Sequence, residues 1–187
     1  FLQYGGPAAF RIRAVLAATG SPSWGMYAGF ELYEHVAVSP GSEEYLDSEK
    51  YQIRIRDWER ADREGTTLAP YVTALNRIRR EHPALRQLRD LTILTSDDPH
   101  VLAFAKRSGD DIVIVVVNVD PHAAHETMVH LDPVALGLPE AGFPVHDELS
   151  GQTWEWGRDN YVRLDPAIEV AHLLTVRARP GNEPRSS

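Results

Sequence analysis

The spacing of apolar side chains divides the chain into two parts. In the first part apolar residues recur every three or four positions, which is the period of one helix face. This spacing predicts a helix over residues 7–18 and a second helix that begins after Thr66 or Thr67 and ends at Pro83. From about Leu91 the period falls to two, which is the period of a strand. The sequence therefore predicts helices first and an all-β block afterwards.

Eight short segments of the second part carry the alternating pattern of strands. Turn-forming residues separate several of them, such as Ser108-Gly109-Asp110 and Ser150-Gly151. Many short strands with regular turns are typical of an antiparallel β-sandwich. The expected strands are Leu91–Thr95, Val101–Lys106, Ile112–Val119, Glu126–Leu131, Phe143–Leu149, Thr153–Trp156, Tyr161–Leu164 and Val170–Arg177.

A strand and a long loop are expected between the two helices. Residues 24–30 are mostly aromatic or small and predict a short buried strand, and residues 31–65 predict a loop without a clear period. A complete (β/α)8 TIM barrel takes about 250 residues, so the first part has room only for its last units. We therefore expect residues 1–89 to be the C-terminal end of such a barrel. Residues 90–179 are expected to form the sandwich, and residues 180–187 a disordered tail.

Composition and charge exclude several classes of function. The chain has 187 residues, with 19 Lys and Arg against 27 Asp and Glu, and a formal charge of -8. Such a chain is a poor candidate for binding nucleic acid or an anionic membrane. Its longest apolar run, residues 112–117, is far shorter than the about 20 residues of a membrane span. No signal peptide is expected, because the N-terminus lacks a basic region followed by an apolar stretch, and no disulfide is expected, because cysteine is absent. The chain starts at Phe1, and we expect it to begin inside a larger protein.

Three histidines lie close together in the sequence and could be metal ligands. His122 and His125 lie at a turn, and His130 follows on an expected strand. Imidazole is a common zinc ligand, but a metal site needs three or four convergent ligands. Solvated surface histidines are therefore the favoured interpretation, and no metal is expected.

Trp154 and Trp156 alternate on one expected strand and therefore share a face. Two aromatic rings on one face could stack on sugar rings. In a sandwich, such a face more often packs in the core or against a neighbouring domain. The packing interpretation is favoured, and the sequence leaves both open.

Carboxylates and one Lys-Tyr pair are the candidates for sugar chemistry. Retaining transfer of a sugar needs two carboxylates about 5–5.5 Å apart. No such pair stands out among the loop acids, which include Glu31 and Glu34. Lys50 and Tyr51 lie in the same loop, and loops that follow barrel strands build the active face of a TIM barrel. These two side chains could hydrogen-bond to sugar hydroxyls or take part in a structural ion pair, and spacing alone does not decide.

One long motif and several shorter ones carry a family resemblance. The long one is Gly41-Ser-Glu-Glu-Tyr-Leu-Asp-Ser-Glu-Lys-Tyr51, followed by Arg56-Asp-Trp58. Residues 2–7, 10–19, 27–32 and 75–85 add to it, and so do Glu148-Leu-Ser-Gly151 and residues 161–166 in the strand block. The first part resembles the end of the catalytic barrel of the α-amylase superfamily, and more narrowly of the bacterial α-1,4-glucan:maltose-1-phosphate maltosyltransferases. The strand block resembles the C-terminal sandwich that follows such barrels.

The resemblance implies an enzyme that transfers maltosyl from α-maltose 1-phosphate to the non-reducing end of an α-1,4-glucan. Configuration would be retained through a covalent glycosyl-enzyme, as part of glycogen or α-glucan synthesis. The resemblance implies a cytoplasmic bacterial enzyme and a homodimer, with no metal or organic cofactor. Lys50 and Tyr51 match the family's sugar-binding pair in the donor site, and Glu31 matches a motif position without an assigned role.

The family's catalytic carboxylates are expected before Phe1, so this chain alone is expected to be inactive. The alternative is a free-standing carbohydrate-binding β-sandwich module, with Trp154 and Trp156 as its stacking platform. Such a module would need no unfinished barrel before it.

Overall fold

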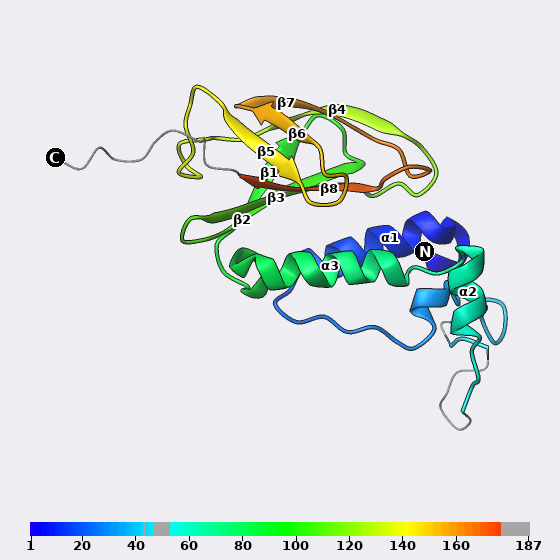
Figure 1. The fold of residues 1–187 in the computed structure, drawn as a ribbon. Coiled ribbons are helices and arrows are strands. Elements are labelled where there is room, and N and C mark those ends of the chain that lie inside the picture. The colour runs from blue at the N-terminus through cyan, green and yellow to red at the C-terminus, as the bar shows by residue number, and fades with distance from the viewer. Residues whose placement is uncertain (43, 47–52, 177–187) are drawn as a thin grey trace.

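Two helices pack against one face of an antiparallel β-sheet that curls into an incomplete barrel (Figure 1). The computed structural model describes residues 1–42, 44–46 and 53–176. In Figure 1, α1 (Leu2–Gly20) and α3 (Ala69–Glu81) lie side by side beneath the layer that contains β2, β3 and β8. None of the helices in these residues has the length and apolar character that a bilayer span requires. The tail expected at residues 180–187 lies outside the described residues.

The first expected helix is confirmed, although it begins earlier than expected. Its geometry is interrupted at Gly6, with φ of 58° and ψ of -159°, directly before Pro7. Glycine adopts such backbone angles at little cost, whereas other residues rarely do. The main helix therefore starts at Pro7, where the missing N–H costs nothing. Its buried face includes Phe10, Ala14 and Ala18.

The second expected helix is confirmed as α3, and a further short helix lies within the expected loop. Val72, Leu75 and Ile78 are buried at intervals of three on α3, and the chain after it continues as the 3-10 helix η2 (Pro83–Arg86). The short helix is α2 (Trp58–Glu64). Asp57 caps α2, because its carboxylate accepts a hydrogen bond from the Arg60 N–H at 2.9 Å.

The strand expected at residues 24–30 is wrong. These residues form an irregular segment that leads into the 3-10 helix η1 (Phe30–Leu32). Gly29 has a φ of 101°, which is incompatible with an extended strand, and the indole N–H of Trp24 donates to Asn76 Oδ1 at 3.2 Å. A buried strand needs paired neighbours for its main-chain groups. All eight strands of the described residues belong to the later sheet, so the assignment of residues 1–89 to a TIM barrel stays a prediction.

All eight strands expected from residue 91 onward are confirmed, and every pairing among them is antiparallel. Their order across the sheet is β6-β5-β8-β3-β2-β1-β4-β7. The first half of β1 pairs with β2, whereas Thr95 and Ser96 pair with β4, so β1 joins two layers. The block is therefore one continuous sheet with β6 and β7 at its ends, rather than two separate sheets. The strands are β1 (Leu91–Ser96), β2 (Val101–Ser108), β3 (Asp111–Asn118), β4 (His125–His130), β5 (Phe143–Asp147), β6 (Thr153–Trp156), β7 (Asp159–Leu164) and β8 (Ala171–Val176).

β3 is buried on both of its faces, by the helices on one side and by the curled sheet on the other. Val113, Val115 and Val117 pack in one cluster with the apolar faces of α1 and α3. Ile114 and Val116, which alternate with them, pack in a second cluster inside the curled sheet. A strand buried on both faces needs apolar residues at every position, which explains the unbroken apolar run at residues 112–117. No observation tests the domain boundary expected at residue 90, which stays a prediction.

Candidate functional site

The predicted sugar-binding pair, Lys50 and Tyr51, lies outside the described residues. The chain before the pair forms a narrow antiparallel turn, in which Ala37 and Tyr45 are bridged. Within this turn the Val38 N–H donates to the Glu44 carbonyl at 2.8 Å, and the Leu46 N–H donates to the Val36 carbonyl at 2.7 Å. These contacts lie a few positions before the predicted pair in the sequence.

Glu34 connects the two ends of the loop that contains the predicted pair. Its carboxylate receives two hydrogen bonds from the Arg56 guanidinium, at 3.0 and 3.1 Å. Arg54 Nε lies 3.5 Å from the same carboxylate. The Arg56 side chain is only 5% exposed, and a two-point contact of this kind is stronger and more directional than a single one. Glu34 is thus a structural anchor of the loop.

Glu31 also holds the main chain in place. Its carboxylate accepts a hydrogen bond from the Gly29 N–H at 3.2 Å, and its carbonyl accepts from the Leu68 N–H at 2.7 Å. The Thr67 hydroxyl donates to the same carbonyl at 3.2 Å. Glu31 therefore ties η1 to the start of α3.

Trp154 and Trp156 share a face of β6, as expected, and this face points toward the inside of the sheet. Trp156 is 5% exposed and belongs to the inner core. Trp154 is partly buried against the same core, and its ring meets the His172 ring edge-to-face at 5.2 Å between centroids. The structure therefore places Trp156 in the core and Trp154 at the boundary between core and solvent.

A cleft of about 600 Å³ opens where the two end strands of the sheet, β6 and β7, face each other. Trp154 and His172 line it from the inside of the sheet, and Gln152 and Ile168 line it from the connections. Four carboxylates and one guanidinium also line the cleft, which gives it a negative charge. These charged residues are Glu155, Asp159, Asp165, Glu169 and Arg163.

A buried carboxylate orients the histidine of this cleft. Asp147 has no exposed surface, and its Oδ2 lies 3.0 Å from His172 Nδ1 and 2.7 Å from the Ser150 hydroxyl. Burial raises the pKa of Asp147, but hydrogen bonds from His172 and Ser150 outweigh burial and leave this pKa below its ordinary value. An ionised Asp147 accepts a hydrogen bond from His172 Nδ1–H, which leaves Nε2 of the neutral ring as a hydrogen-bond acceptor. Sequence reasoning missed this pair, because Asp147 and His172 are 25 positions apart.

The three candidate metal-ligating histidines do not converge. His125 bonds two carboxylates, through Nδ1 to Asp98 at 2.6 Å and through Nε2 to Asp120 at 3.2 Å. Asp98, His100 and His125 could offer three ligand atoms within 4.8 Å of one another, but both ring nitrogens of His125 are already engaged. Neither His122 nor His130 belongs to this group.

These histidine contacts shift the pKa values of their members. The backbone N–H of His100 and the His125 ring lower the pKa of Asp98 to about 2. The hydrogen bond that the His125 ring donates to Asp98 in turn raises the pKa of His125. The ring of His130, held between Asp159 at 2.6 Å and Asp97 at 3.1 Å, also has a raised pKa because of these two partners.

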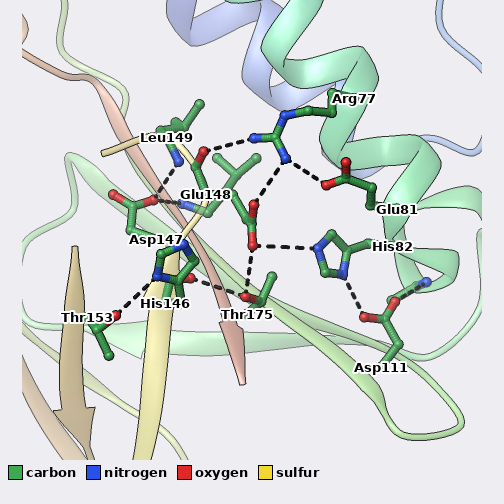
Figure 2. A network of polar contacts seen from close by, with 12 residues as sticks. Arg77, Glu81, His82, Asp111, His146, Asp147, Glu148, Leu149, Thr153 and Thr175 are labelled. Atoms are coloured by element: carbon green, nitrogen blue, oxygen red, sulfur yellow. Dashed lines mark hydrogen bonds and ion pairs between the residues drawn. The ribbon is translucent and has the colours of Figure 1, made fainter. Parts of the chain in front are cut away.

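A polar network joins the end of α3 to the sheet (Figure 2). Glu148 lies at its centre, where its carboxylate accepts from Arg77 at 3.4 Å and from the Thr175 hydroxyl at 3.2 Å. His82 Nδ1 lies 2.7 Å from Asp111, whose other oxygen accepts from the Ala84 N–H at 2.8 Å. The pair Arg77 and Glu81, four residues apart, is visible in the sequence. Its link to Glu148 depends on tertiary structure, because Glu148 lies 71 positions away from Arg77.

Comparison with known proteins assigns most of the chain to one group of relatives. Residues 93–176 match the family described as GLGE, C-terminal. The chain is 57% identical over 178 residues to alpha-1,4-glucan:maltose-1-phosphate maltosyltransferase 2 of Streptomyces coelicolor, which covers 95% of this chain and 27% of the relative. It is 49% identical over 182 residues to the maltosyltransferase of Mycobacterium tuberculosis, which covers 96% of this chain and 26% of that relative. The chain thus spans about a quarter of the length of these relatives.

Solved structures with a similar fold include an alpha-amylase and a cyclomaltodextrin glucanotransferase. An alpha-amylase from Geobacillus thermoleovorans, solved with acarbose, matches with a TM-score of 0.65 at 22% identity, over 93% of this chain and 34% of that chain. A cyclomaltodextrin glucanotransferase matches with a TM-score of 0.61 at 20% identity, over 94% of this chain and 34% of that chain. At these identities the match concerns the fold. The resemblance seen in the sequence is confirmed by the names of the relatives.

Proposed function

We propose that this chain is the C-terminal part of an α-1,4-glucan:maltose-1-phosphate maltosyltransferase. It matches about a quarter of the length of such enzymes. The enzyme transfers maltosyl from α-maltose 1-phosphate to the non-reducing end of an α-1,4-glucan, with retention of configuration. The observation that carries the proposal is 57–58% identity to two Streptomyces coelicolor maltosyltransferases over 94–95% of the chain.

In this proposal, residues 1–89 are the last units of a TIM barrel, and Lys50 and Tyr51 bind the sugar of the donor. Lysine offers three hydrogen-bond donors and tyrosine one donor and acceptor, which suits neighbouring sugar hydroxyls. Support comes from the anchors of the loop on both sides of the pair. Arg56 and Glu34 hold together the described residues on the two sides of the pair.

In this proposal the sheet holds in place the two helices that flank the donor-site segment. α1 and α3 pack on β3 and β8 through a shared core, so the helices that lead into and out of the loop rest on the sheet. The catalytic carboxylates belong to the remaining three quarters of the enzyme. The protein would work in the bacterial cytoplasm, in glycogen or α-glucan synthesis, and as a homodimer, without a metal or organic cofactor.

The free-standing binding module is the weaker alternative. Residues before 91 would have no purpose in it, yet the relatives match 94–97% of this chain, which includes most of those residues. Trp156, half of its stacking platform, is buried in the core.

A chimera tests the proposed function. The 187 residues replace the matching segment of the Streptomyces coelicolor maltosyltransferase 1, which is 58% identical over the shared part. We expect phosphate release from α-maltose 1-phosphate in the presence of maltoheptaose, at a rate similar to that of the unmodified relative. The 187-residue chain alone should release none. A chimera that folds but does not transfer maltosyl, or a chain that transfers it alone, would contradict the proposal.

A further inference from the structure

We propose that the cleft between β6 and β7 is a second carbohydrate site, which binds a neutral α-1,4-glucan chain away from the donor loop. The cleft lies where the sheet fails to close, with Trp154 and His172 on its inner side. Its volume of about 600 Å³ is in the range of sites that hold small organic ligands, about 300–1,000 Å³. The choice of an α-1,4-glucan as ligand rests on the proposed function.

Aromatic and aliphatic surface gives the cleft its affinity for the apolar faces of sugar rings. Trp154 lines the cleft and is only partly buried. Its ring is held by an edge-to-face contact with the ring of His172. Ile168 is 72% exposed and Tyr161 is 60% exposed, and both also line the cleft. A large aromatic ring held in one orientation loses little conformational entropy when a ligand stacks on it.

Polar groups in the same cleft match the hydroxyl groups of a sugar. Asp147 engages His172 Nδ1 at 3.0 Å. The His172 side chain is 17% exposed, and Nε2 is the ring nitrogen that Asp147 does not engage. With its proton on Nδ1, the ring presents Nε2 as an acceptor for a sugar hydroxyl. The exposed amide of Gln152 adds a donor and an acceptor.

The charge of the cleft selects for an uncharged ligand. Carboxylates are hydrogen-bond acceptors, and the four that line the cleft make it acidic, although Glu169 already accepts from the Tyr71 hydroxyl at 2.8 Å. They repel a phosphate, and the single guanidinium of Arg163 already lies 3.4 Å from Asp165. The donor, α-maltose 1-phosphate, therefore does not fit this cleft, whereas a neutral glucan chain does.

The test is isothermal titration of the 187-residue chain with maltoheptaose, cellohexaose and α-maltose 1-phosphate. We expect binding of maltoheptaose, and neither of the other two sugars should match it. Trp154→Ala should weaken binding roughly tenfold or more, as expected when an aromatic stacking contact is lost. Trp58→Ala, which removes a tryptophan that is 45% exposed and lies on α2, is the matched control and should bind normally.

A second variant guards against loss of folding in Trp154→Ala. In His172→Asn the amide can still donate to Asp147, while the acceptor at Nε2 is lost, so binding should weaken and the melting temperature should change little. Unchanged affinity in both cleft variants, or loss of affinity only in Trp58→Ala, would overturn the cleft as the site. Failure of this binding is distinct from failure of the proposed function, because phosphate release by the chimera depends on the donor site.

Discussion

Lys106 on β2 donates a hydrogen bond from its ammonium group to the carbonyl oxygen of Thr19, in the last turn of α1, at 3.2 Å. Neither residue exposes any surface, and the same ammonium donates to the Gln87 carbonyl at 2.6 Å. Burial lowers the pKa of Lys106, and the nearby charge of Arg79 lowers it further. The last carbonyls of a helix have no partner within the helix and carry partial negative charge. Lys106 therefore ties the end of α1 to the sheet.

Arg79 completes this contact from α3. Its guanidinium donates to the Ala18 carbonyl of α1, to the Ser21 carbonyl at 2.8 Å and to the Pro22 carbonyl at 2.8 Å. Burial lowers the pKa of Arg79 as well. Two buried cations thus hold the end of one helix through main-chain carbonyls.

Replacement of Lys106 by methionine should lower the free energy of unfolding by about 1–3 kcal/mol, because buried carbonyls of Thr19 and Gln87 lose their donor. Methionine keeps most of the volume, so the cavity term stays small. Urea denaturation measures the change. Arg89→Met, at an exposed position, is the control and should stay within about 0.5 kcal/mol. Equal stability of the two variants would show that the contact does not stabilise the fold.

The stability of the chain should fall as the pH rises above about 6.5, the ordinary pKa of histidine. Asp98 and Asp120 raise the pKa of His125, so the folded state binds its proton more tightly than the unfolded state does. This contribution is complete below the unfolded pKa and is lost as the pH rises through the folded pKa. His100, stacked on His125 at 4.5 Å, faces the same group.

Urea midpoints between about pH 6 and pH 9 measure this loss. His125→Gln should reduce the slope without removing it, since His130 has a raised pKa for the same reason. His122→Gln, at an exposed position, should leave the slope unchanged. The stabilisation that comes from the lowered pKa values of Asp98 and Asp120 is complete above about pH 4 and is lost only as the pH falls below it, so it adds no slope in this range. A slope that His125→Gln does not change would contradict the assignment.

The strand block, residues 90–179, should keep its strands but lose stability when it is produced without the helices. Val113, Val115 and Leu173 pack in the cluster that α1 and α3 complete, and all three have no exposed surface in the whole chain. Each such side chain contributes roughly 1.5–3 kcal/mol when it is buried. Circular dichroism should still show β-structure, with a lower melting temperature and self-association in sedimentation. A monomer as stable as the whole chain would show that the two parts are independent domains.

Lys50→Ala in the chimera should reduce kcat/KM for α-maltose 1-phosphate roughly ten- to a hundred-fold, because a hydrogen bond from a charged group contributes about 1.5–3 kcal/mol. Tyr51→Phe removes a neutral hydroxyl and should reduce it less. Melting temperatures distinguish this role from a structural ion pair. A Lys50→Ala chimera with normal kinetics and a lower melting temperature would assign Lys50 to structure instead.

The strand block was predictable because its signals are local. Alternation of apolar and polar residues, interrupted by turn residues, placed all eight strands. The buried helix faces and the break before Pro7 were likewise visible as spacing and as a proline position. The segment at residues 24–30 was misread because its small and aromatic residues fit a buried strand, yet strand formation needs hydrogen-bonded neighbours that local composition cannot supply.

The sequence by itself therefore determined the strands, the helix faces and the family, through periodicity and through one long motif. Only the tertiary structure decided how these elements meet. Asp147 and His172 form one pair because β5 and β8 are neighbours in the sheet. Trp156 is buried in the core while Trp154 is only partly buried, although both share a face of β6 at the end of the sheet. Which strands close together is fixed by contacts between distant residues, and no local pattern records those contacts.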